Sequence, residues 1–426
     1  MGTMDKILNA LRKLIPSPVF RALQSPYHYA LAYLGAWRFG FPSRRLVVIA
    51  VTGTKGKTST TELINSILEE AGHFTALANT IRFKVGNESK RNLFKMTMPG
   101  RFFQQHFLAQ ARRAGCTHVV MEMSSEGAKQ HRHRFVDLDA LVLTNLAPEH
   151  IEAHGSFEAY KKAKENIAKQ LSISRKKNHL LVLNADEKEF ASFRTIPRLT
   201  VISYSLADVA PYRGDDRGSA FTFEGKTVLS PLPGVFSVYN MLAAATLSKA
   251  LGVKNDAIKR GLEKVHTIAG RAERIEEGQG FPVIVDYAHT PESLQALYRA
   301  FDGYSRVCVL GNTGGGRDRW KRKDMGAIAD QMCDTIILTN EDPYDENPRA
   351  ILADMEQGIK THKPETILDR RDAIARALTL GAFGKKSAVL ITGKGTDPYI
   401  MEAGGKKTPW SDSAVTREEL KRLLHK

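Results

Sequence analysis

The chain contains 426 residues, of which 42% are hydrophobic and 25% are charged. This composition is typical of a globular protein and excludes fibrous and low-complexity chains, while the length predicts two or three domains. The formal net charge of +16 favours a polyanionic partner such as nucleic acid, a membrane surface or a nucleotide-linked substrate. We expect no nucleic-acid partner, because no RNA-binding signature or aromatic and basic stripe accompanies the charge.

Residues 1–45 are predicted to form a short helical arm that is basic and aromatic. Its apolar tract, AYLGAWRFGF, is interrupted and falls short of the roughly 20 apolar residues that span a bilayer. Two interpretations stay open: the arm packs on the main body, or it lies on a membrane surface. No A-x-A-like cleavage site follows, so a secretory signal is not predicted.

The three cysteines, Cys116, Cys308 and Cys333, are odd in number and far apart in the sequence. We therefore expect neither a disulfide framework nor a CxxC metal site. This cysteine usage fits a reducing cytoplasm.

The stretch RRLVVIAVTGTKGKTSTTELINSILEEAG, residues 44–72, reads as a buried strand, a loop of small residues and an amphipathic helix. In such phosphate loops the lysine reaches the terminal phosphates and the following hydroxyl holds Mg²⁺, which assigns Lys57 and Thr58. Val51 stands where the strict pattern has glycine. We expect ATP or GTP to bind here, through Thr52, Gly53, Thr54, Lys55, Gly56, Lys57, Thr58 and Ser59.

A second buried strand, within THVVMEMSSEG, ends at Glu122. A carboxylate among Met121 and Met123 is costly to bury without a partner, so we interpret Glu122 as a metal ligand beside the phosphate loop. His150 and His154 follow in a loop bracketed by Pro148 and Gly155, where no helix is predicted. Oxygen ligands dominate this region, which favours magnesium over zinc.

A helix with Asn240 at its start and a stop at Gly252 follows, and a domain boundary is expected near residues 266–280. Beyond it, strands leave polar residues after their carboxyl ends, as in doubly wound sheets. We predict an α/β fold with a P-loop-type parallel sheet in residues 46–268 and a smaller Rossmann-like domain in residues 269–426.

Taken in order, the motifs resemble those of the Mur ligase family of ATP-dependent amide-forming enzymes. They are VTGTKGKTSTTELI, VVMEMSSEG, TNLAPEHIEAHGSFEAYKKAK, VYNMLAAA, GRAERI, VDYAHTPESL, GGGRDRWKR and GKGTDPYI. The likeness runs from about residue 46 to the C-terminus and is greatest to the branch that adds the third residue of the peptidoglycan stem peptide. It implies a cytoplasmic enzyme that uses ATP and Mg²⁺ to activate a carboxylate for attack by an amine.

The resemblance also implies residue roles. Lys57 would bind the terminal phosphates, Thr58 and Glu122 one magnesium, and His150 a second, while Lys164 matches the lysine that is carbamylated in the family. From its sequence neighbours alone, Lys164 reads as part of a solvated helix face. The remaining ATP contacts would be Asn240, Arg271, Asp286 and His289. We expect the substrates to contact Thr97, Ser124, Arg317, Asp342, Tyr344, Lys394 and Asp397.

Departures from the family pattern concern the substrates. Tyr344 replaces the arginine that pairs with the distal carboxylate in diaminopimelate-adding members, and this disfavours diaminopimelate. Asp397 replaces a glutamate that would hold the substrate's amino group. The N-terminal arm is much shorter than the family's uridine-nucleotide domain, so a UDP-linked acceptor is an open question.

Three hypotheses follow. The first is a ligase that adds an amino acid to an anionic muropeptide-like acceptor, working as a monomer or homodimer. The second is a ligase that elongates another acid of the folate or polyglutamate type. The third is a nucleotide-binding subunit of a membrane-associated amidotransferase complex, with the N-terminal arm as its docking element.

Overall fold

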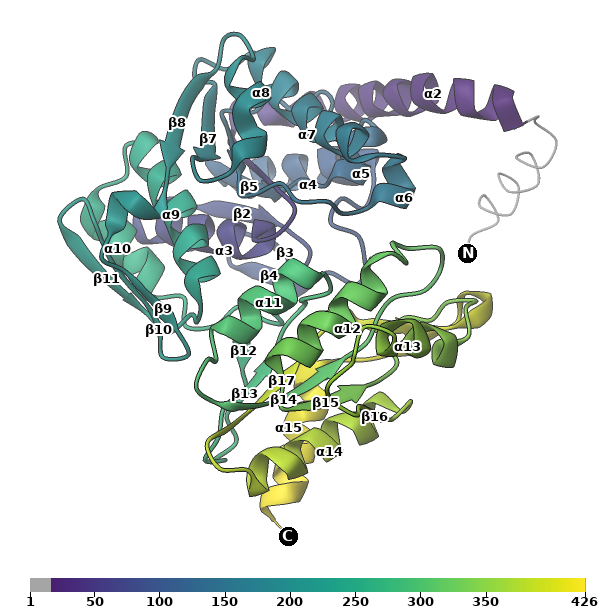
Figure 1. The fold of residues 1–426 in the computed structure, drawn as a ribbon. Helices are drawn as coiled ribbons and strands as arrows, with labels where there is room; N and C mark the ends of the chain where they lie inside the picture. Colours follow the sequence, from purple (N-terminus) through teal and green to yellow (C-terminus); the bar gives the residue numbers. More distant parts are fainter. Residues whose placement is uncertain (1–16, 426) are drawn as a thin grey trace.

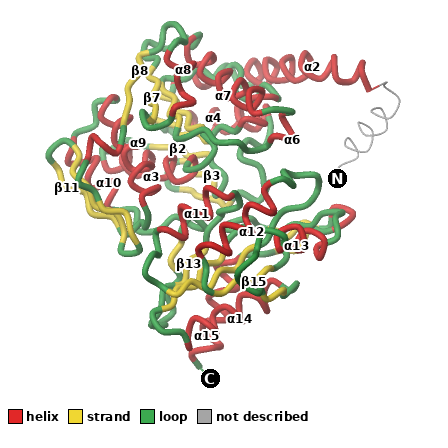
Figure 2. The backbone as a smooth tube through the Cα atoms, viewed as in Figure 1, coloured by secondary structure: helices red, strands yellow, loops and turns green. Residues whose placement is uncertain are grey.

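The computed structural model describes residues 17–425 and contains two α/β units (Figure 1). Helix α2 (Ser17–Arg38) projects from the first unit, and the 3-10 turn η1 (Pro42–Arg45) leads from it into the first strand. Residues 1–16 of the predicted arm lie outside the described part of the chain. Most of the chain at the junction of the two units is loop (Figure 2). The predicted α/β fold class is confirmed.

The first unit is built on an eight-stranded sheet in which six consecutive strands run parallel. Its order is β4 (Glu88–Arg91), β3 (Arg82–Val85), β2 (Thr75–Ala78), β5 (His118–Glu122), β1 (Val47–Thr52), β6 (Ala140–Leu143), β7 (Leu180–Asn184) and β8 (Thr200–Tyr204). At one edge of the sheet, β3 pairs antiparallel with both β2 and β4. Alternate residues of β1 point to opposite faces, so Val48 and Ala50 join one core, and Ile49 and Val51 the other.

Helices cover both faces of this sheet. One face carries α4 (Arg101–Arg113) and α7 (Phe157–Ser172), and the other carries α3 (Lys57–Glu70), α9 (Val235–Ala250) and α10 (Asn255–Glu263). The shorter elements are α5 (Ser125–Lys129), α6 (Ile151–His154), η2 (Lys188–Phe190), α8 (Ala191–Arg194) and η3 (Leu206–Val209). A small antiparallel sheet of β9 (Arg213–Asp215), β10 (Gly218–Phe223) and β11 (Lys226–Ser230) packs beside α9 and α10.

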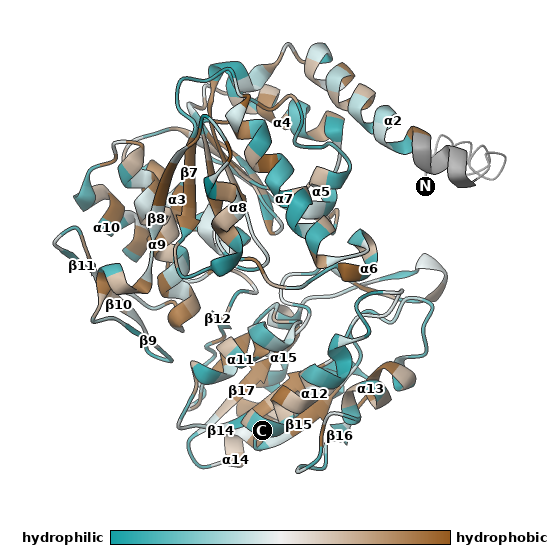
Figure 3. Ribbon diagram, turned by 45° about the horizontal axis from the view of Figure 1, so that its top comes forward, coloured by the Kyte–Doolittle hydropathy of each residue, from teal (hydrophilic) through white to brown (hydrophobic). Residues whose placement is uncertain are grey.

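The second unit is a six-stranded sheet between two layers of helices. Its order is β12 (Glu273–Arg274), β13 (Val283–Val285), β17 (Ser387–Ile391), β14 (Ser305–Leu310), β15 (Thr335–Leu338) and β16 (Glu365–Thr366), and only β12 is antiparallel. Helices α11 (Pro291–Arg299), α12 (Lys321–Met332) and α13 (Pro348–Glu356) cover one face, and α14 (Arg370–Phe383) and α15 (Asp412–Leu424) the other. The strands of this unit are mainly hydrophobic (Figure 3). A hairpin of β18 (Tyr399–Met401) and β19 (Lys407–Pro409), joined by η4 (Ala403–Gly405), follows β17.

The structure corrects three expectations. Cys308 and Cys333 form a disulfide, because β14 and β15 are parallel neighbours joined by α12, and this brings residues 25 positions apart together. The cysteine pattern therefore no longer argues for a reducing compartment. A one-turn helix, α6, lies between His150 and Gly155, where none was expected. Asn240 lies in the second turn of α9, which begins at Val235.

Candidate active site

The loop between β1 and α3 contains two glycines at which a side chain would clash. Gly53 has φ 151°, and a Cβ atom there would lie 2.0 Å from Thr144 Oγ1. Gly56 has φ 80°, directly precedes α3, and its Cβ would lie 2.2 Å from Asn240 Oδ1. Because both positions lack side chains, the backbone N–H groups at the start of α3 can accept an anion, as a phosphate loop requires.

Lys57, the first residue of α3, folds back over this loop. Its Nζ donates hydrogen bonds to the carbonyl oxygens of Gly53 at 3.1 Å and Thr54 at 2.9 Å. Burial lowers the pKa of the Lys57 ammonium, and the nearby Glu122 carboxylate opposes this shift. The ammonium is thus held among weak neutral acceptors, which phosphate oxygens can replace with stronger charge-assisted bonds.

Glu122 is the last residue of β5 and lies beside Val51 of β1 in the sheet register. Its Oε2 accepts hydrogen bonds from Thr58 Oγ1 at 2.9 Å, Thr80 N at 3.0 Å and Thr80 Oγ1 at 3.0 Å. The side chain is buried and forms no ion pair with any residue in the described range 17–425. A buried carboxylate next to a hydroxyl is a ligand pair that suits Mg²⁺.

Within residues 17–425, no three His, Cys, Asp or Glu side chains cluster closely enough to hold a metal ion. His150 lies on the loop before α6 with φ 56°, and its N–H donates to Asp318 Oδ2 at 2.7 Å. Its ring Nδ1 lies 3.9 Å from Glu126 Oε1, and burial lowers its pKa. Thr58 and Glu122 are therefore joined by a direct hydrogen bond. Within the described chain, His150 contacts neither of these two residues.

Lys164 of α7 is buried, which corrects the interpretation of a solvated helix face. Its Nζ donates to the carbonyl oxygen of Gly53 at 2.7 Å and lies 4.6 Å from the centre of the Tyr160 ring. Burial, reinforced by the charge of Lys57, holds the pKa of Lys164 well below its ordinary value. Its helical neighbour Lys162 is exposed, so the two lysines face opposite environments.

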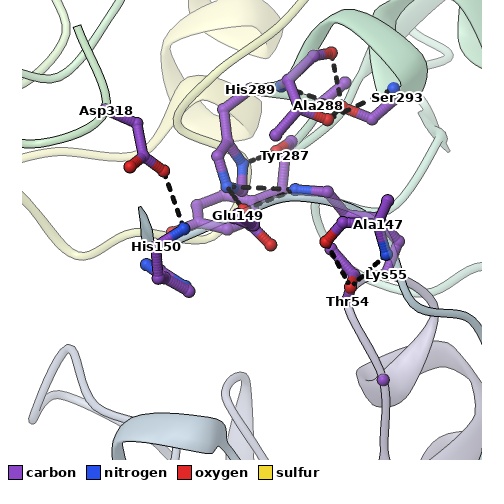
Figure 4. A network of polar contacts seen from close by, with 12 residues as sticks. Thr54, Lys55, Ala147, Glu149, His150, Tyr287, Ala288, His289, Ser293 and Asp318 are labelled. Carbon is purple, nitrogen blue, oxygen red and sulfur yellow. Dashed lines mark hydrogen bonds and ion pairs between the residues drawn. The ribbon is translucent and has the colours of Figure 1, made fainter. Parts of the chain in front are cut away.

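A polar network joins the phosphate loop to the second unit (Figure 4). The carboxylate of Glu149 pairs with Lys55 Nζ at 2.8 Å and with His289 Nε2 at 2.8 Å. Burial alone would raise the pKa of Glu149, but Lys55 and His289 hold it well below its ordinary value. Burial lowers the pKa of His289 to about 4, so its ring is neutral near pH 7.

Residues predicted for the nucleoside side of ATP meet near the same junction. Asp286 accepts hydrogen bonds from the N–H groups of Ala272 and Ala288, each at 2.6 Å. The Arg271 guanidinium lies 4.6 Å from the centre of the Tyr287 ring. Asp286 therefore fixes the backbone around Arg271 as well as facing the cavity.

The second unit contributes a cluster of opposite charges. The fully buried Lys394 Nζ lies 2.8 Å from Asp342 Oδ1 and 3.3 Å from Asp397 Oδ2. Lys95, from the loop after β4, reaches across from the first unit to the same two carboxylates, at 2.5 Å and 3.2 Å. Tyr344, at φ 50°, lies beside this cluster, and the Arg317 guanidinium is 5.9 Å from its ring centre.

One cavity of about 980 Å³ connects these groups. Of the predicted residues, it is lined by Thr54, Lys55, Gly56, Lys57, Thr58, Ser59, Thr97, Glu122, Ser124, His150, Asn240, Arg271, Asp286, His289, Arg317, Asp342 and Asp397. The predicted residues that do not line it are Thr52, Gly53, Lys164, Tyr344 and Lys394. Of these, Lys164 donates a hydrogen bond to Gly53 and Lys394 donates one to the lining residue Asp342. Phosphate-binding and charge-pairing groups thus share a single space between the units.

Comparison with known proteins agrees with this geometry. Residues 51–248 match the model of the Mur ligase middle domain, and residues 270–395 match that of the Mur ligase glutamate ligase domain. The UDP-N-acetylmuramoyl-L-alanyl-D-glutamate–2,6-diaminopimelate ligase of Halalkalibacterium halodurans is 36% identical over 403 residues, covering 92% of this chain and 82% of the relative.

The chain belongs to the Mur ligase family.

A second relative of this Mur ligase, the ligase of the same name from Syntrophomonas wolfei, is 35% identical and covers 87% of this chain and 78% of its own length. A solved structure of a diaminopimelate ligase matches with a TM-score of 0.62 and 28% identity, covering 93% of this chain and 83% of its own. Folylpolyglutamate synthase from Mycobacterium tuberculosis matches with a TM-score of 0.70 and 16% identity, covering 93% and 95% of the two chains. At that identity, the last likeness concerns the fold alone.

Sequence reasoning missed three residues of this site. Glu149 has no role assigned from the sequence, although its burial between Lys55 and His289 makes it the centre of the junction network. Thr80 and Lys95 were not singled out, and nothing in their sequence surroundings marks them. Their partners, Glu122 and Asp342, are distant in the sequence, so only the fold brings these groups together.

Proposed function

We propose that this Mur ligase uses ATP to join an amino acid to a carboxylate of an anionic muropeptide-like acceptor. The observation that carries the proposal is the shared cavity, in which the phosphate loop of the first unit faces the Asp342 and Asp397 carboxylates of the second. The half of the cavity formed by the phosphate loop suits a nucleotide, and the half that contains the two carboxylates suits an ammonium group. An amide-forming ligase must bring these two ligands together.

ATP with Mg²⁺ supplies the activation: transfer of the terminal phosphoryl group to the acceptor carboxylate gives an acyl phosphate and ADP, and attack by the amine then yields the amide and phosphate. We assign Lys57 to bind the terminal phosphates, and Thr58 and Glu122 to hold magnesium. These cationic and oxygen-rich groups are fixed before reaction, as electrostatic stabilisation of gathering negative charge requires. The roles of Asn240, Arg271, Asp286 and His289 toward the nucleotide are part of the same proposal.

We propose that Lys164 is carbamylated and thereby carries a negative charge. Carbamylation requires a neutral amine, and burial of Lys164 favours that form. Addition of carbon dioxide to the neutral Nζ, with loss of one proton, would replace a buried neutral amine with a carbamate, whose negative charge would lie near Glu122. Such a group would supply the further oxygen ligand that the pair of Thr58 and Glu122 lacks. His150 is proposed as the ligand of a second magnesium ion.

For the amino acid, we propose that Asp397 and Asp342 receive an ammonium group and that diaminopimelate is not the preferred substrate. The relatives named above are diaminopimelate ligases. This chain has Tyr344 in place of the arginine expected in that branch, and tyrosine cannot form a bidentate pair with a carboxylate. Arg317, Thr97 and Ser124 are the remaining proposed substrate contacts.

The cavity is also lined by cationic side chains outside the phosphate loop, namely Lys95, Arg132 and Arg317, and we propose an anionic acceptor for this reason. We also propose that the enzyme works in the cytoplasm, where ATP and cell-wall precursors are available, as a monomer or homodimer. None of the helices between residues 17 and 425 combines the length and apolar character needed to cross a bilayer.

The test is a reaction of the purified full-length protein with ATP, Mg²⁺, UDP-N-acetylmuramoyl-L-alanyl-D-glutamate and a panel of single amino acids. We expect phosphate release that requires both acceptor and amino acid, and a product heavier by one amino-acid residue. A parallel reaction with a pteroate acceptor and glutamate tests the folate-type alternative. Release of phosphate only in that reaction, or in neither, would overturn the proposal.

A further inference from the structure

One side of helix α2 is packed on the first unit. Ala32 and Ala36 are buried, and the rings of Tyr29 and Tyr33 lie edge-on against Phe135, with centroids 5.1 and 5.3 Å away. The backbone of Arg101 in α4 approaches Gly35 of α2. These contacts fix which side of α2 faces the body and which faces away.

The opposite side of α2 carries a stripe of large apolar side chains, defined here as the outer stripe: Leu23, Tyr27, Leu34 and Trp37. At 3.6 residues per turn, their positions fall on a single side of the helix, opposite Ala32 and Ala36. Their exposed fractions are 56%, 52%, 47% and 62%. A surface helix normally exposes its polar side, so an exposed apolar stripe indicates an interaction surface.

The surroundings of the outer stripe are cationic. The sequence has no Asp or Glu between Lys6 and Thr61, nor between Ser89 and Met121, so α2, η1 and α4 contain no acidic residue. Arg38, Arg45, Arg112 and Arg113 are exposed and form no ion pair with any residue of the described segment 17–425. Figure 1 shows α2 reaching away from the body, which leaves its far side accessible.

We propose that the outer stripe docks on an anionic membrane surface, with α2 lying in the plane of the headgroups. Trp and Tyr favour this interface because their rings are apolar and their tips are polar, and basic side chains are attracted to anionic lipid. A second copy of the chain fits less well, because pairing two α2 helices would bring Arg38 and Arg45 of each copy together without any acidic partner on the helix. The docking is reversible and independent of the ligase chemistry.

The test is sedimentation of the full-length protein with vesicles of phosphatidylcholine alone and of equal parts phosphatidylcholine and phosphatidylglycerol. We expect binding to the anionic vesicles only, weakened by added salt and reduced at least tenfold in the double variant Leu34→Ser/Trp37→Ser. The matched control is Phe383→Ser, which removes a side chain of α14 that is 85% exposed. Arg38→Gln/Arg45→Gln tests the charge while leaving the outer stripe intact, and it should also weaken binding.

Unchanged thermal unfolding of each variant shows that the fold is retained. Absence of binding to anionic vesicles, or equal binding by wild type and the stripe variant, would overturn the proposal. The proposal would also be overturned if the wild type forms a concentration-dependent dimer, does not bind vesicles, and loses the dimer in the Leu34→Ser/Trp37→Ser variant. That result would show that the outer stripe binds a second copy of the chain.

Discussion

Lys95 of the first unit and Asp342 of the second form an ion pair, with Nζ and Oδ2 2.5 Å apart. Lys95 also lies 3.2 Å from Asp397, the residue proposed to receive the ammonium of the amino acid. A side chain of the protein therefore occupies a position that suits the substrate's charge, and the two ammonium groups would compete for the same carboxylates.

Lys95→Ala should therefore lower the KM of the amino acid. A charge-assisted contact contributes about 1.5 kcal/mol or more, which corresponds to about tenfold in KM. The measurement is phosphate release against amino-acid concentration at saturating ATP and acceptor. Lys90→Ala, which removes a lysine of β4 whose side chain is 82% exposed, is the control. A higher KM or a lower kcat would mean that Lys95 assembles the site instead of competing for it.

Lys57→Ala should reduce kcat/KM by about a hundredfold or more, because loss of one preorganised cationic group at a charged transition state has an effect of that size. Lys57→Arg should stay impaired, since guanidinium cannot reproduce the geometry of an ammonium that fits between the Gly53 and Thr54 carbonyls. Steady-state kinetics of both variants checks this. Activity within tenfold of wild type would contradict the assignment of Lys57 to the phosphates.

Lys164→Ala should abolish turnover, and short carboxylic acids added to the assay should restore part of it by replacing the proposed carbamate. The matched control is Lys162→Ala on the same helix, whose side chain is exposed and should be dispensable. Thermal unfolding of both variants identifies a general loss of structure. A folded Lys164→Ala protein that no carboxylic acid rescues would argue against the carbamate.

Tyr344→Arg should raise the preference for diaminopimelate over amino acids without a distal carboxylate by about tenfold or more, because a charge-assisted bidentate pair contributes about 1.5–3 kcal/mol. The measurement is the ratio of kcat/KM for diaminopimelate and for lysine. Tyr344→Phe keeps the ring without adding charge and should leave the ratio unchanged. An unchanged ratio in Tyr344→Arg would place the distal group of the amino acid elsewhere.

His133 should make the protein less stable in mild acid. Burial, assisted by Arg134, lowers the pKa of His133 to about 3, whereas the unfolded chain takes up the proton near the ordinary value of 6.5. Between these two pKa values the unfolded state binds more protons than the folded state. The free energy of unfolding is therefore unaffected by His133 above pH 6.5 and decreases as the pH falls toward 3. Between pH 7 and pH 5, the free energy of unfolding of the His133→Gln variant should fall by about 2 kcal/mol less than that of the wild type, as measured by urea unfolding. Equal losses would show that His133 is protonated in the folded protein.

The sequence predicts those parts of the site that depend on local order. The strand, the glycine loop and the helix from residue 44 to residue 72 are contiguous, so their periodicity and small residues predict a phosphate loop. Glu122 was predicted for a similar reason, since an acidic residue at the end of an apolar run needs a partner. The family resemblance supplied the remaining roles.

The other features depend on contacts between distant segments. Lys164 follows two lysines in its helix, and only the packing of α7 on the Gly53 loop shows that it is buried. The disulfide depends on β14 and β15 being neighbours, and the Lys95 ion pair joins two separate units. No local pattern contains this information.

The contact of Lys55 with Glu149 and His289 has a thermodynamic consequence. Lys55 belongs to the phosphate loop, and His289 lies between β13 and α11 of the second unit. A nucleotide that draws Lys55 away from Glu149 changes the free energy of holding the units together. Binding free energies are reciprocal, so a ligand that moves the second unit must alter nucleotide affinity by the same factor. The affinities for the nucleotide and for a ligand of the second unit are thereby coupled through a single buried carboxylate.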